Sequence, residues 1–264
     1  MLSSNEKSIS EEIFATGDYD KRYFDQALKL FPFDSFKNKK IIFFDVGANQ
    51  GTFTLLAIKS GYFKKIIAIE PHLKTFKQLR INLLLNNFDL DNDSISLFNV
   101  AIDPFLKRIE FEINDYTSGD NRVRLTNPVN QINLYSENDR RTETVSCEKL
   151  QKILEEVSIG MGDILCWFWI DVQGAEVRVL QSLDNEVIQK SVFVLEVWEY
   201  GLKRLGNSIE NLALLLEKHH AFILNFDHPN YRFEIIDAKD MSKYLENTGV
   251  ESYDVMFVPK SLIT

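Results

Sequence analysis

The sequence has little cysteine, no long apolar run and no excess of positive charge. Its two cysteines, Cys147 and Cys166, lack metal-ligand spacing and belong to different expected elements, so we expect two reduced thiols in the core. No apolar run is long enough to cross a bilayer, which excludes a membrane span from the expected structure. The opening residues MLSSNEKSIS lack the basic and apolar pattern of a secretory leader, and this predicts a cytoplasmic protein.

Acidic residues outnumber basic ones, 39 to 30, giving a formal net charge of −9. Because phosphate backbones are bound through Lys and Arg, this balance argues against nucleic acid as a partner. A chain that is 45% hydrophobic and 26% charged is typical of a globular protein. Strand and helix patterns alternate over most of its length, which predicts one α/β domain at 41–264 after a helical segment at 1–40. No oligomeric state is predicted.

The segment at 1–40 carries apolar residues at helical spacing before Pro32. One interpretation is a helix that packs on the edge of the sheet. The alternative is a lid over a ligand site, because end segments often gate such sites. The residues that form the apolar pattern are Tyr23, Phe24, Ala27, Leu28 and Phe31.

The stretch IIFFDVGANQGTF at 41–53 organises the rest of the chain. Its apolar start predicts a buried strand at 41–46, and Gly47 and Gly51 bracket a polar turn before a helix at 51–60. Glycine at these positions allows a sharp turn and a close approach of the backbone to a ligand. A strand, a glycine turn and a helix in this order predict a nucleotide-binding corner.

Two acidic residues restrict the ligand expected at this corner. Asp45 ends the first strand, where its charge would repel a pyrophosphate and attract a cation, and the G-x-G-x-x-G dinucleotide pattern is absent. Glu70 ends a second strand at 66–70, the position from which a carboxylate reaches a ribose diol. S-adenosylmethionine, which has an ammonium, a sulfonium and a ribose, matches both.

Several motifs resemble those of the FkbM family of S-adenosylmethionine-dependent methyltransferases. The D-V-x-G-A-E core at 171–176 is the most particular to that family, whereas the glycine corner is shared by many class I methyltransferases. The sequence departs from the family by having Trp169 where a Lys usually stands two residues before Asp171. The matching stretches are DVGANQG (45–51), AIEP (68–71), NLLLNN (82–87), FNVAID (98–103), WIDVQGAEVRVL (169–180), VFVLEVWE (192–199) and DVMFVPK (254–260).

The resemblance implies a class I methyltransferase fold. This is a Rossmann-like three-layer sandwich with a mostly parallel seven-stranded sheet of order 3-2-1-4-5-7-6, in which one strand, the last, is antiparallel. The methyltransferase domain would span 41–264 and carry a β/loop insertion at about 104–149. Cofactor binding is expected from Asp45, Gly47, Asn49 and Gly51 for the methionine part, Glu70 for the ribose, Asn99 and Ala101 for the adenine, and Asp171 at the site of transfer.

Apolar patterns place the remaining elements. Helices are expected at 73–86, at 148–157, at a start marked by Gly174 and Ala175, and at 209–219, with His219 and His220 at its end. In the first of these, the residues that would face the core are Leu73, Phe76, Leu79 or Arg80, Leu83 and Leu84. Strands are expected at 95–100, 108–113, 122–125, 142–146, 164–170, 191–197, 222–226 and 254–258, with an edge segment at 232–236.

Methyl transfer to a hydroxyl requires alignment and a group that takes the proton. Asp171 is the first candidate for this catalytic role; the alternatives are that it holds the methionine ammonium or caps the following helix. His228 is the second candidate, because histidine exchanges protons near neutral pH. Asp171, Glu196 and Glu199 form an oxygen set that a divalent metal would accept, but such sets lack diagnostic spacing, so no metal site is predicted.

The acceptor is expected to be a sugar, a glycan precursor or another small molecule. Polar loops carry specificity on a rigid scaffold, so Tyr116, Asn121 and Arg122 are candidate contacts, together with Glu196 and Trp198 at the end of a strand. Trp167 and Trp169 are expected in the core. The favoured reaction is O-methylation of a sugar hydroxyl; the alternatives are a small natural product as acceptor, a nicotinamide-dependent dehydrogenase, and a binding subunit without catalysis.

Overall fold

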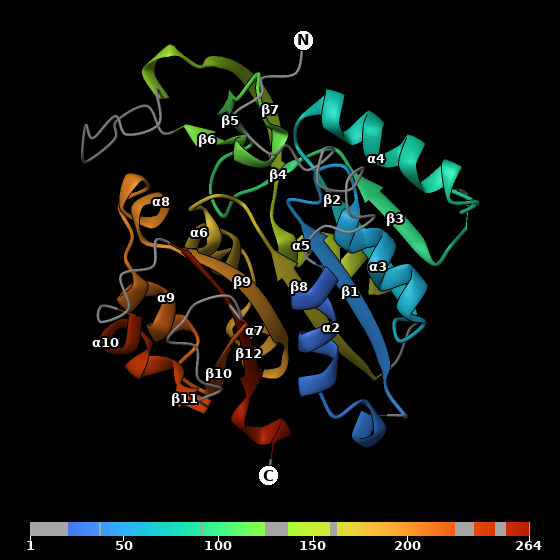
Figure 1. The fold of residues 1–264 in the computed structure, drawn as a ribbon, viewed down its shortest axis with the longest axis vertical. Helices are drawn as coiled ribbons and strands as arrows, with labels where there is room; N and C mark the ends of the chain where they lie inside the picture. The colour runs from blue at the N-terminus through green and yellow to red at the C-terminus, as the bar shows by residue number, and fades with distance from the viewer. Residues whose placement is uncertain are drawn as a thin grey trace.

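The central sheet is built from the apolar runs of the sequence (Figure 1). The computed structural model describes residues 21–36, 38–90, 92–124, 137–158, 163–224, 235–245 and 252–263. Eight strands pair in the order β11-β10-β12-β9-β8-β1-β2-β3. They are β1 (Lys40–Val46), β2 (Lys65–Ile69), β3 (Ile95–Phe98), β8 (Ile164–Ile170), β9 (Val192–Trp198), β10 (His219–Ile223), β11 (Ile235–Asp237) and β12 (Ser252–Pro259).

The strand order confirms the predicted fold class. β3-β2-β1-β8-β9-β12-β10 is the predicted order 3-2-1-4-5-7-6, and β12 is antiparallel to both of its neighbours. β11 adds an eighth strand, antiparallel to β10, at the edge where the sequence predicted only an edge segment. Parts of the predicted segments at 222–226 and 232–236 lie outside the described residues. Because both faces of the central strands are covered, their sequences read as continuous apolar runs.

Helices cover the sheet on both faces and make three layers (Figure 1). Residues that alternate along β1 divide between them: Phe43 packs in one core cluster, and Ile42 and Phe44 pack in the other. The first face is covered by α2 (Lys21–Leu30), α3 (Thr52–Ser60) and α4 (Leu73–Leu85), and the second by α5 (Leu150–Ser158), α6 (Glu176–Gln181), α7 (Asn185–Lys190), α9 (Ile209–Leu215) and α10 (Met241–Leu245).

α2 crosses the middle of the sheet and not its edge. The ring of Phe24 lies 6.0 Å from that of Phe43 on β1 and 5.6 Å from that of Trp169 on β8, between ring centroids. Phe31 contacts Trp167 at 5.0 Å. The prediction of an edge helix is therefore wrong in position, because the large rings of the two central strands supply the apolar surface that α2 buries. Residues 1–20, on which the lid alternative depends, lie outside the described residues.

Two other local predictions are corrected. In α4, Phe76, Leu79 and Leu83 are buried as expected, but Leu73 and Leu84 are 50% and 56% exposed, because only part of a helix surface can face the core. His219 and His220 do not end a helix: α9 ends at Leu215 and both residues begin β10. Pairing with Pro259 and Val258 of β12 places them in the sheet.

A second, smaller sheet fills the insertion. It contains β4 (Ala101–Ile102), β5 (Arg108–Ile113), β6 (Arg122–Arg124) and β7 (Arg141–Glu148) in the order β4-β7-β5-β6. Its apolar residues, Ile109, Phe111 and Val123 among them, pack with Ala175 and with Leu205, which follows α8 (Glu199–Arg204). The insertion therefore lies beside the carboxyl ends of the parallel strands (Figure 1).

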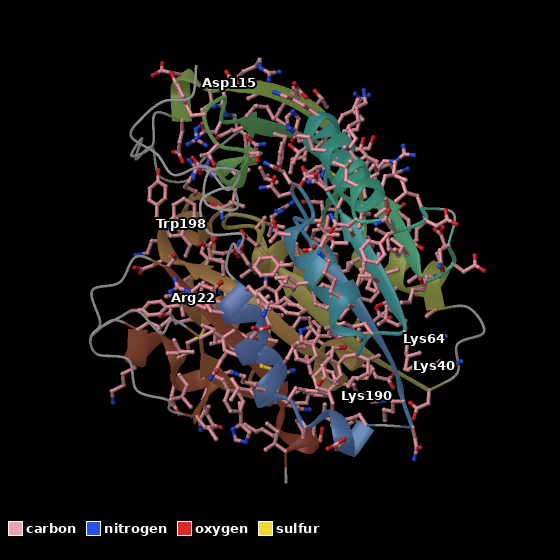
Figure 2. The ribbon with its side chains drawn as sticks, turned by 45° about the vertical axis from the view of Figure 1, so that its right-hand side comes forward. Arg22, Lys40, Lys64, Asp115, Lys190 and Trp198 are labelled. Carbon is pink, nitrogen blue, oxygen red and sulfur yellow. The ribbon has the colours of Figure 1, made fainter. Side chains whose placement is uncertain are left out.

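Charge differs between the two ends of the main sheet. Lys40, Lys64 and Lys190 lie at or just before the starts of β1, β2 and β9, and Figure 2 shows them together at the end of the molecule opposite Asp115 in the insertion. Asp45, Glu70 and Asp171 lie at the carboxyl ends of β1, β2 and β8. Three acidic side chains thus lie at the end where parallel sheets bind ligands.

Candidate active site

Gly47 holds the end of β1 against the end of β8. Its φ is +87°, its N–H donates to the carbonyl of Ile69 at 2.9 Å, and the N–H of Asp171 donates to the carbonyl of Val46 at 3.0 Å. A Cβ at Gly47 would lie 1.9 Å from the carbonyl oxygen of Asp171. Only glycine fits this turn, which brings the backbone at the ends of β1, β2 and β8 to one point.

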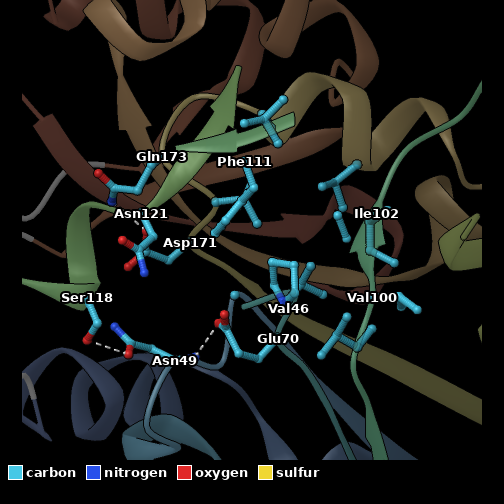
Figure 3. Close-up of a pocket in the computed structure, with 18 of the residues that line it drawn as sticks. Val46, Asn49, Glu70, Val100, Ile102, Phe111, Ser118, Asn121, Asp171 and Gln173 are labelled. Carbon is cyan, nitrogen blue, oxygen red and sulfur yellow. Dashed lines mark hydrogen bonds between the residues drawn. The ribbon is translucent and has the colours of Figure 1, made fainter. Parts of the chain in front are cut away.

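A cavity opens beside this turn, and we call it the rim cavity. It encloses about 600 Å³, including the open space at its mouth, within the range of small-ligand pockets. Figure 3 shows that the rim cavity has a polar end, with Asn49, Asn121 and Asp171, and an apolar end. Glu70 lies between the two ends. The apolar end is lined by Val46, Ile69, Val100, Ala101, Ile102 and Phe111.

Glu70 is fixed at the middle of the rim cavity. One carboxylate oxygen accepts the N–H of Asn49 at 3.0 Å and the other accepts the N–H of His72 at 2.8 Å. Burial raises the pKa of Glu70 to about 7, against the lowering effect of these two hydrogen bonds. Each oxygen keeps a second lone pair, so the carboxylate can still accept two hydroxyl groups of a ligand.

Three of the residues predicted to bind the cofactor have other contacts. Asp45 does not line the cavity; it accepts a hydrogen bond from the hydroxyl of Thr54 and ties β1 to α3, and burial raises its pKa to about 7. Gly51 lies against α4, where a Cβ would come 2.3 Å from Leu79 Cδ1. Asn99 donates to the carbonyls of Glu70 and Pro71, at 2.8 and 2.9 Å. These contacts indicate that Asp45, Gly51 and Asn99 support the backbone around the cavity and do not bind the cofactor directly.

A second cavity adjoins the rim cavity, and we call it the acidic cavity. It encloses about 960 Å³ including open space, and the two cavities share Gly47, Asn49, Gly119, Asp171 and Gln173. Its wall brings together carboxyl groups from three strands and the insertion with two aromatic rings stacked 4.2 Å apart, between centroids. These residues are Asp171, Glu196, Asp254, Asp120, Phe53 and Trp169.

Gln173 joins two of these carboxyl groups and was missed by the sequence analysis. Its side-chain nitrogen donates to Asp171 Oδ1 at 2.8 Å and to Glu196 Oε2 at 2.6 Å. The only signal in the sequence was its variable position inside the D-V-x-G-A-E motif. Burial raises the pKa of both Asp171 and Glu196, and the charge of Asp171 raises that of Glu196 further.

The predicted acceptor contacts divide into two groups. Asn121 lines the rim cavity and Glu196 lines the acidic cavity. Tyr116 is 78% exposed and lines neither cavity. Arg122 is fully buried, and Trp198 lies below it, with the guanidinium 5.2 Å from the ring centroid, so both belong to the packing of the insertion. His228 lies outside the described residues.

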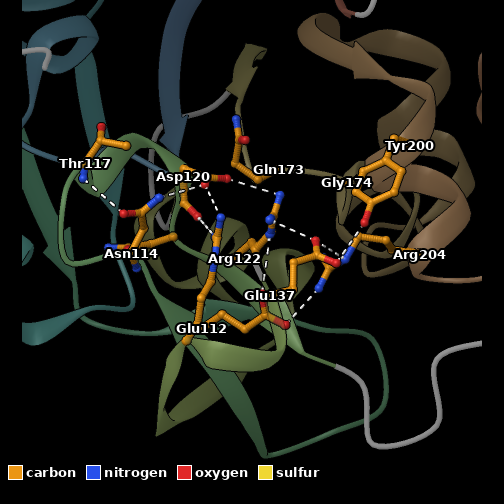
Figure 4. A network of polar contacts seen from close by, with 12 residues as sticks. Glu112, Asn114, Thr117, Asp120, Arg122, Glu137, Gln173, Gly174, Tyr200 and Arg204 are labelled. Carbon is orange, nitrogen blue, oxygen red and sulfur yellow. Dashed lines mark hydrogen bonds and ion pairs between the residues drawn. The ribbon is translucent and has the colours of Figure 1, made fainter. Parts of the chain in front are cut away.

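Arg122 is the centre of a buried ion network (Figure 4). It pairs with Glu112 at 3.5 Å, Asp120 at 3.1 Å and Glu137 at 2.8 Å. Arg204 of α8 pairs with Glu112 and Glu137, both at 2.8 Å. The prediction that Arg122 binds substrate is wrong in this arrangement, because the charges around it are supplied by the protein itself.

The proposed oxygen set for a metal is not assembled. Glu199 is exposed on α8 and pairs with Lys203 at 2.6 Å, away from Asp171 and Glu196. In the described part of the chain, no three His, Cys, Asp or Glu residues are grouped so that they could hold a metal ion. None of the described helices combines the length and the apolar character needed to cross a membrane.

Glu176 fixes the loop that carries Asp171 and Gln173. It is fully buried, and its Oε1 accepts the N–H groups of Val172 at 3.3 Å and Gly174 at 3.1 Å. Burial raises its pKa to about 7, so the folded chain retains a proton that the unfolded chain loses near pH 4.5. Stability falls with rising pH wherever the folded state binds more protons. The contribution of Glu176 therefore lowers the unfolding free energy progressively as the pH rises from about 4.5 to about 7.

We expect Glu176→Gln to remove this contribution. The unfolding free energy of the variant, measured by urea denaturation across this pH range, should fall less with rising pH than that of the wild type, because a neutral amide has no proton to lose. Glu155→Gln, on the exposed side of α5, is the matched control and should leave the pH profile unchanged. Parallel profiles for the wild type and Glu176→Gln would contradict the assignment.

Gly174 is required by close packing as well as by its backbone angle. Its φ is +104°, and a Cβ would lie 2.4 Å from the backbone carbon of Gly201 in α8. Gly61 offers a matched control, since its φ is +72° with nothing within 4 Å of a Cβ. We expect Gly61→Ala to lower the unfolding free energy by about 1 kcal/mol and Gly174→Ala by about 3 kcal/mol. Equal losses in urea denaturation would show that the contact with α8 carries no energy.

Comparison with known proteins identifies the family to which the chain belongs. The model of the methyltransferase FkbM domain matches residues 45–233. Curated proteins give no match. Among solved structures, methyltransferase FkbM from Methylobacillus flagellatus KT is similar at 12% identity and a TM-score of 0.43, covering 83% of this chain and 43% of that one. This chain therefore spans less than half the length of that protein.

Two further structures are similar at the same level. A putative methyltransferase from Streptococcus mutans, in complex with SAH, has 12% identity and a TM-score of 0.40, covering 83% of this chain and 88% of that one. Precorrin-6y C5,15-methyltransferase from Geobacter metallireducens GS-15 has 12% identity and a TM-score of 0.44, covering 98% and 94%. The matched range of the family model covers more than half of the sequence and contains the glycine corner, Glu70 and the D-V-x-G-A-E core. The chain belongs to the FkbM methyltransferase family, as its motifs predicted.

Proposed function

We propose that the chain transfers a methyl group from S-adenosylmethionine to a hydroxyl group of a sugar or glycan precursor. The observation that carries this proposal is the meeting of two cavities at Gly47 and Asp171, one partly apolar with a fixed carboxylate and the other acidic. A donor and an acceptor held in the two cavities would face each other at this point. Family membership supports methyl transfer over the dehydrogenase.

The rim cavity suits an adenosyl donor. Glu70 would accept the ribose hydroxyls, and Val100, Ala101 and Ile102 offer apolar surface to an adenine ring. The polar end, with Asn49 and Asp171, would hold the methionine part. Negative charge at Glu70 and Asp171 favours a cationic ligand and disfavours a pyrophosphate. When bound, S-adenosylmethionine supplies a methyl group activated by a sulfonium.

The acidic cavity suits an uncharged, hydroxylated acceptor. Carboxylates accept hydrogen bonds from hydroxyl groups. The half-buried ring of Phe53, which is stacked on the buried ring of Trp169, offers an aromatic surface of the kind that sugars pack against. Trp169 stands behind Phe53 in this wall, at the position where the resemblance to the FkbM family implied a Lys. A phosphate group would be repelled by Asp171, Glu196 and Asp254. A small hydroxylated natural product remains the alternative acceptor.

Asp171 is our candidate for the group that receives the proton of the acceptor. It lines both cavities and is therefore next to the point of transfer. Burial raises its pKa, and a carboxylate with a raised pKa is a better proton acceptor than an ordinary one. Gly47 and the backbone of Asp171 would align the reacting groups by holding both cavities in register.

The test is transfer of a tritiated methyl group from S-adenosylmethionine to free, lipid-linked and nucleotide-linked sugars. We expect label in a neutral or lipid-linked sugar as a methyl ether, and less label in the nucleotide-linked forms. Tight donor binding without transfer to any of these acceptors would overturn the proposal and favour a binding subunit.

A further inference from the structure

The side chain of Gln173 lies between two carboxyl groups that come from neighbouring strands. Asp171 follows β8 and Glu196 lies in β9, which run parallel with Ile170 opposite Leu195. The two N–H groups of the Gln173 amide have one acceptor on each side, Asp171 Oδ1 and Glu196 Oε2. Figure 3 shows Gln173 above Asp171 at the polar end of the rim cavity. Both N–H groups of the Gln173 amide are therefore engaged by these two carboxyl groups.

The backbone around Gln173 is held in an unfavourable shape. Its φ of 55° lies in the left-handed region, which is uncommon for a residue with a side chain. Gly174 is pressed against the backbone of Gly201, and Glu176 accepts the N–H groups on both sides of Gln173, those of Val172 and Gly174. Strain that persists because its surroundings enforce it is common at functional sites.

The surroundings of the carboxyl pair are acidic on every side. Among the described residues, the groups that act most strongly on the pKa of Asp171 and of Glu196 include no Lys, Arg or His. The charges of Asp171, Asp254 on β12 and Glu176 on α6 raise the pKa of Glu196. The charge of Asp171 in turn raises the pKa of Asp45 and of Glu70. Two neighbouring carboxyl groups without a cation do not both ionise readily, so they share a proton.

We propose that Asp171 and Glu196 act as one proton-accepting pair, and that Gln173 is the positioning residue that holds the pair together. This inference rests on the proposed function, because it assigns the destination of the proton of the acceptor. Burial raises the pKa of both carboxyl groups, and the charge of Asp171 raises that of Glu196 further, which prepares the singly charged pair to take up one more proton.

The step balances in atoms and charge. A bond forms between the acceptor oxygen and the methyl carbon, and the bond between that carbon and the sulfonium sulfur breaks, with its electron pair going to sulfur. The O–H proton of the acceptor passes to a carboxylate oxygen of the pair. The positive charge of the sulfonium and the negative charge of the pair disappear together, so the transfer itself creates no new charge.

Gln173→Met tests the positioning role, since it keeps the length of the side chain and removes both N–H donors. These donors stabilise the charged pair, so their loss should move the acidic limb of the pH–rate profile upward by about one pH unit. The turnover rate at pH values below the limb should fall about tenfold and recover at higher pH. Gln173→Glu adds negative charge beside the pair and should move the limb in the same direction. It replaces Gln173→Met in this test if the Met variant does not fold.

Gln189→Met on α7, where Gln189 accepts a hydrogen bond from Lys218 at 3.1 Å, is the matched control and should leave the limb in place. A merely structural role for Gln173 lowers the rate equally at all pH values. An unmoved limb in both Gln173 variants, with transfer intact in the wild type, would overturn the inference and leave the proposed function standing.

A second measurement does not depend on turnover. The infrared spectrum of the protein with S-adenosylhomocysteine at neutral pH should contain a protonated carboxyl stretch that Glu196→Gln removes or shifts. A band unaffected by this substitution would overturn the shared proton. If the expected band is seen but no sugar is methylated, the proposed acceptor would be overturned and the carboxyl pair would be supported.

Discussion

Glu70→Ala is expected to weaken S-adenosylmethionine binding by at least about 100-fold. Two ribose hydroxyls would lose a charged acceptor, and hydrogen bonds to charged groups contribute about 1.5–3 kcal/mol each. The N–H groups of Asn49 and His72 would lose their acceptor too, which loosens the turn beside Gly47. Calorimetric titration with S-adenosylhomocysteine measures the effect without requiring an acceptor.

Glu155→Ala on the exposed side of α5 is the control for loss of one acidic residue, and its affinity should equal that of the wild type. Circular dichroism and urea denaturation establish that the Glu70 variant is folded. Near-normal affinity in folded Glu70→Ala protein would show that the ribose lies elsewhere, and the donor site would have to be abandoned.

Arg122→Met should lower the unfolding free energy by about 3–5 kcal/mol, because removing one partner of a buried ion network leaves the others unpaired. Arg122 is fully buried, and its partners Glu112 and Glu137 are 1% and 7% exposed. Met fills much of the space of the Arg side chain, so the lower unfolding free energy would result from the lost charge more than from the lost volume. Urea denaturation at neutral pH is the measurement.

The matched control is Arg141→Met, because the Arg141 side chain is 51% exposed and pairs with Glu143 and Asp115 at the surface. Its unfolding free energy should change by less than about 1 kcal/mol, since exposed ion pairs contribute little. A small loss of stability in Arg122→Met together with a large rise in the KM for the acceptor would contradict the structural role and restore the predicted contact with substrate.

The ion network also links the insertion to the site. Asp120 lines the acidic cavity and pairs with both Arg122 and Arg140. The hydroxyl of Tyr200 on α8 donates to Glu137 at 2.8 Å, so α8 and the inserted sheet are fixed to each other (Figure 4). One wall of the acidic cavity is thus positioned by the contacts between α8 and the inserted sheet.

The layers of the fold could be predicted from local pattern, but the position of helices on them could not. Apolar runs such as Phe43–Phe44 and Trp167–Phe168 signal buried strands because parallel strands are covered on both faces. The strand order came from resemblance to the FkbM family. α2 was placed at the edge because its apolar pattern predicts a buried face but does not say which surface receives it.

The candidate site could be predicted where the position of a residue at the end of a strand places it at one edge of the sheet. Gly47, Glu70 and Asp171 follow three parallel strands, and such ends meet at one edge of the sheet. Arg122 was misassigned because a charged residue in a polar segment is normally solvated, whereas this one is buried among the carboxylates of Glu112, Asp120 and Glu137. Gln173 was missed because its role depends on Glu196, which reaches it only through pairing of β8 with β9.

The most direct test of the account is a crystal structure of the chain with S-adenosylhomocysteine. We expect the ribose hydroxyls on the carboxylate of Glu70, the adenine at the apolar end of the rim cavity, and the sulfur beside Gly47 and Asp171, facing the acidic cavity. A ligand bound outside the rim cavity, or one whose sulfur faces away from Asp171, would contradict the account.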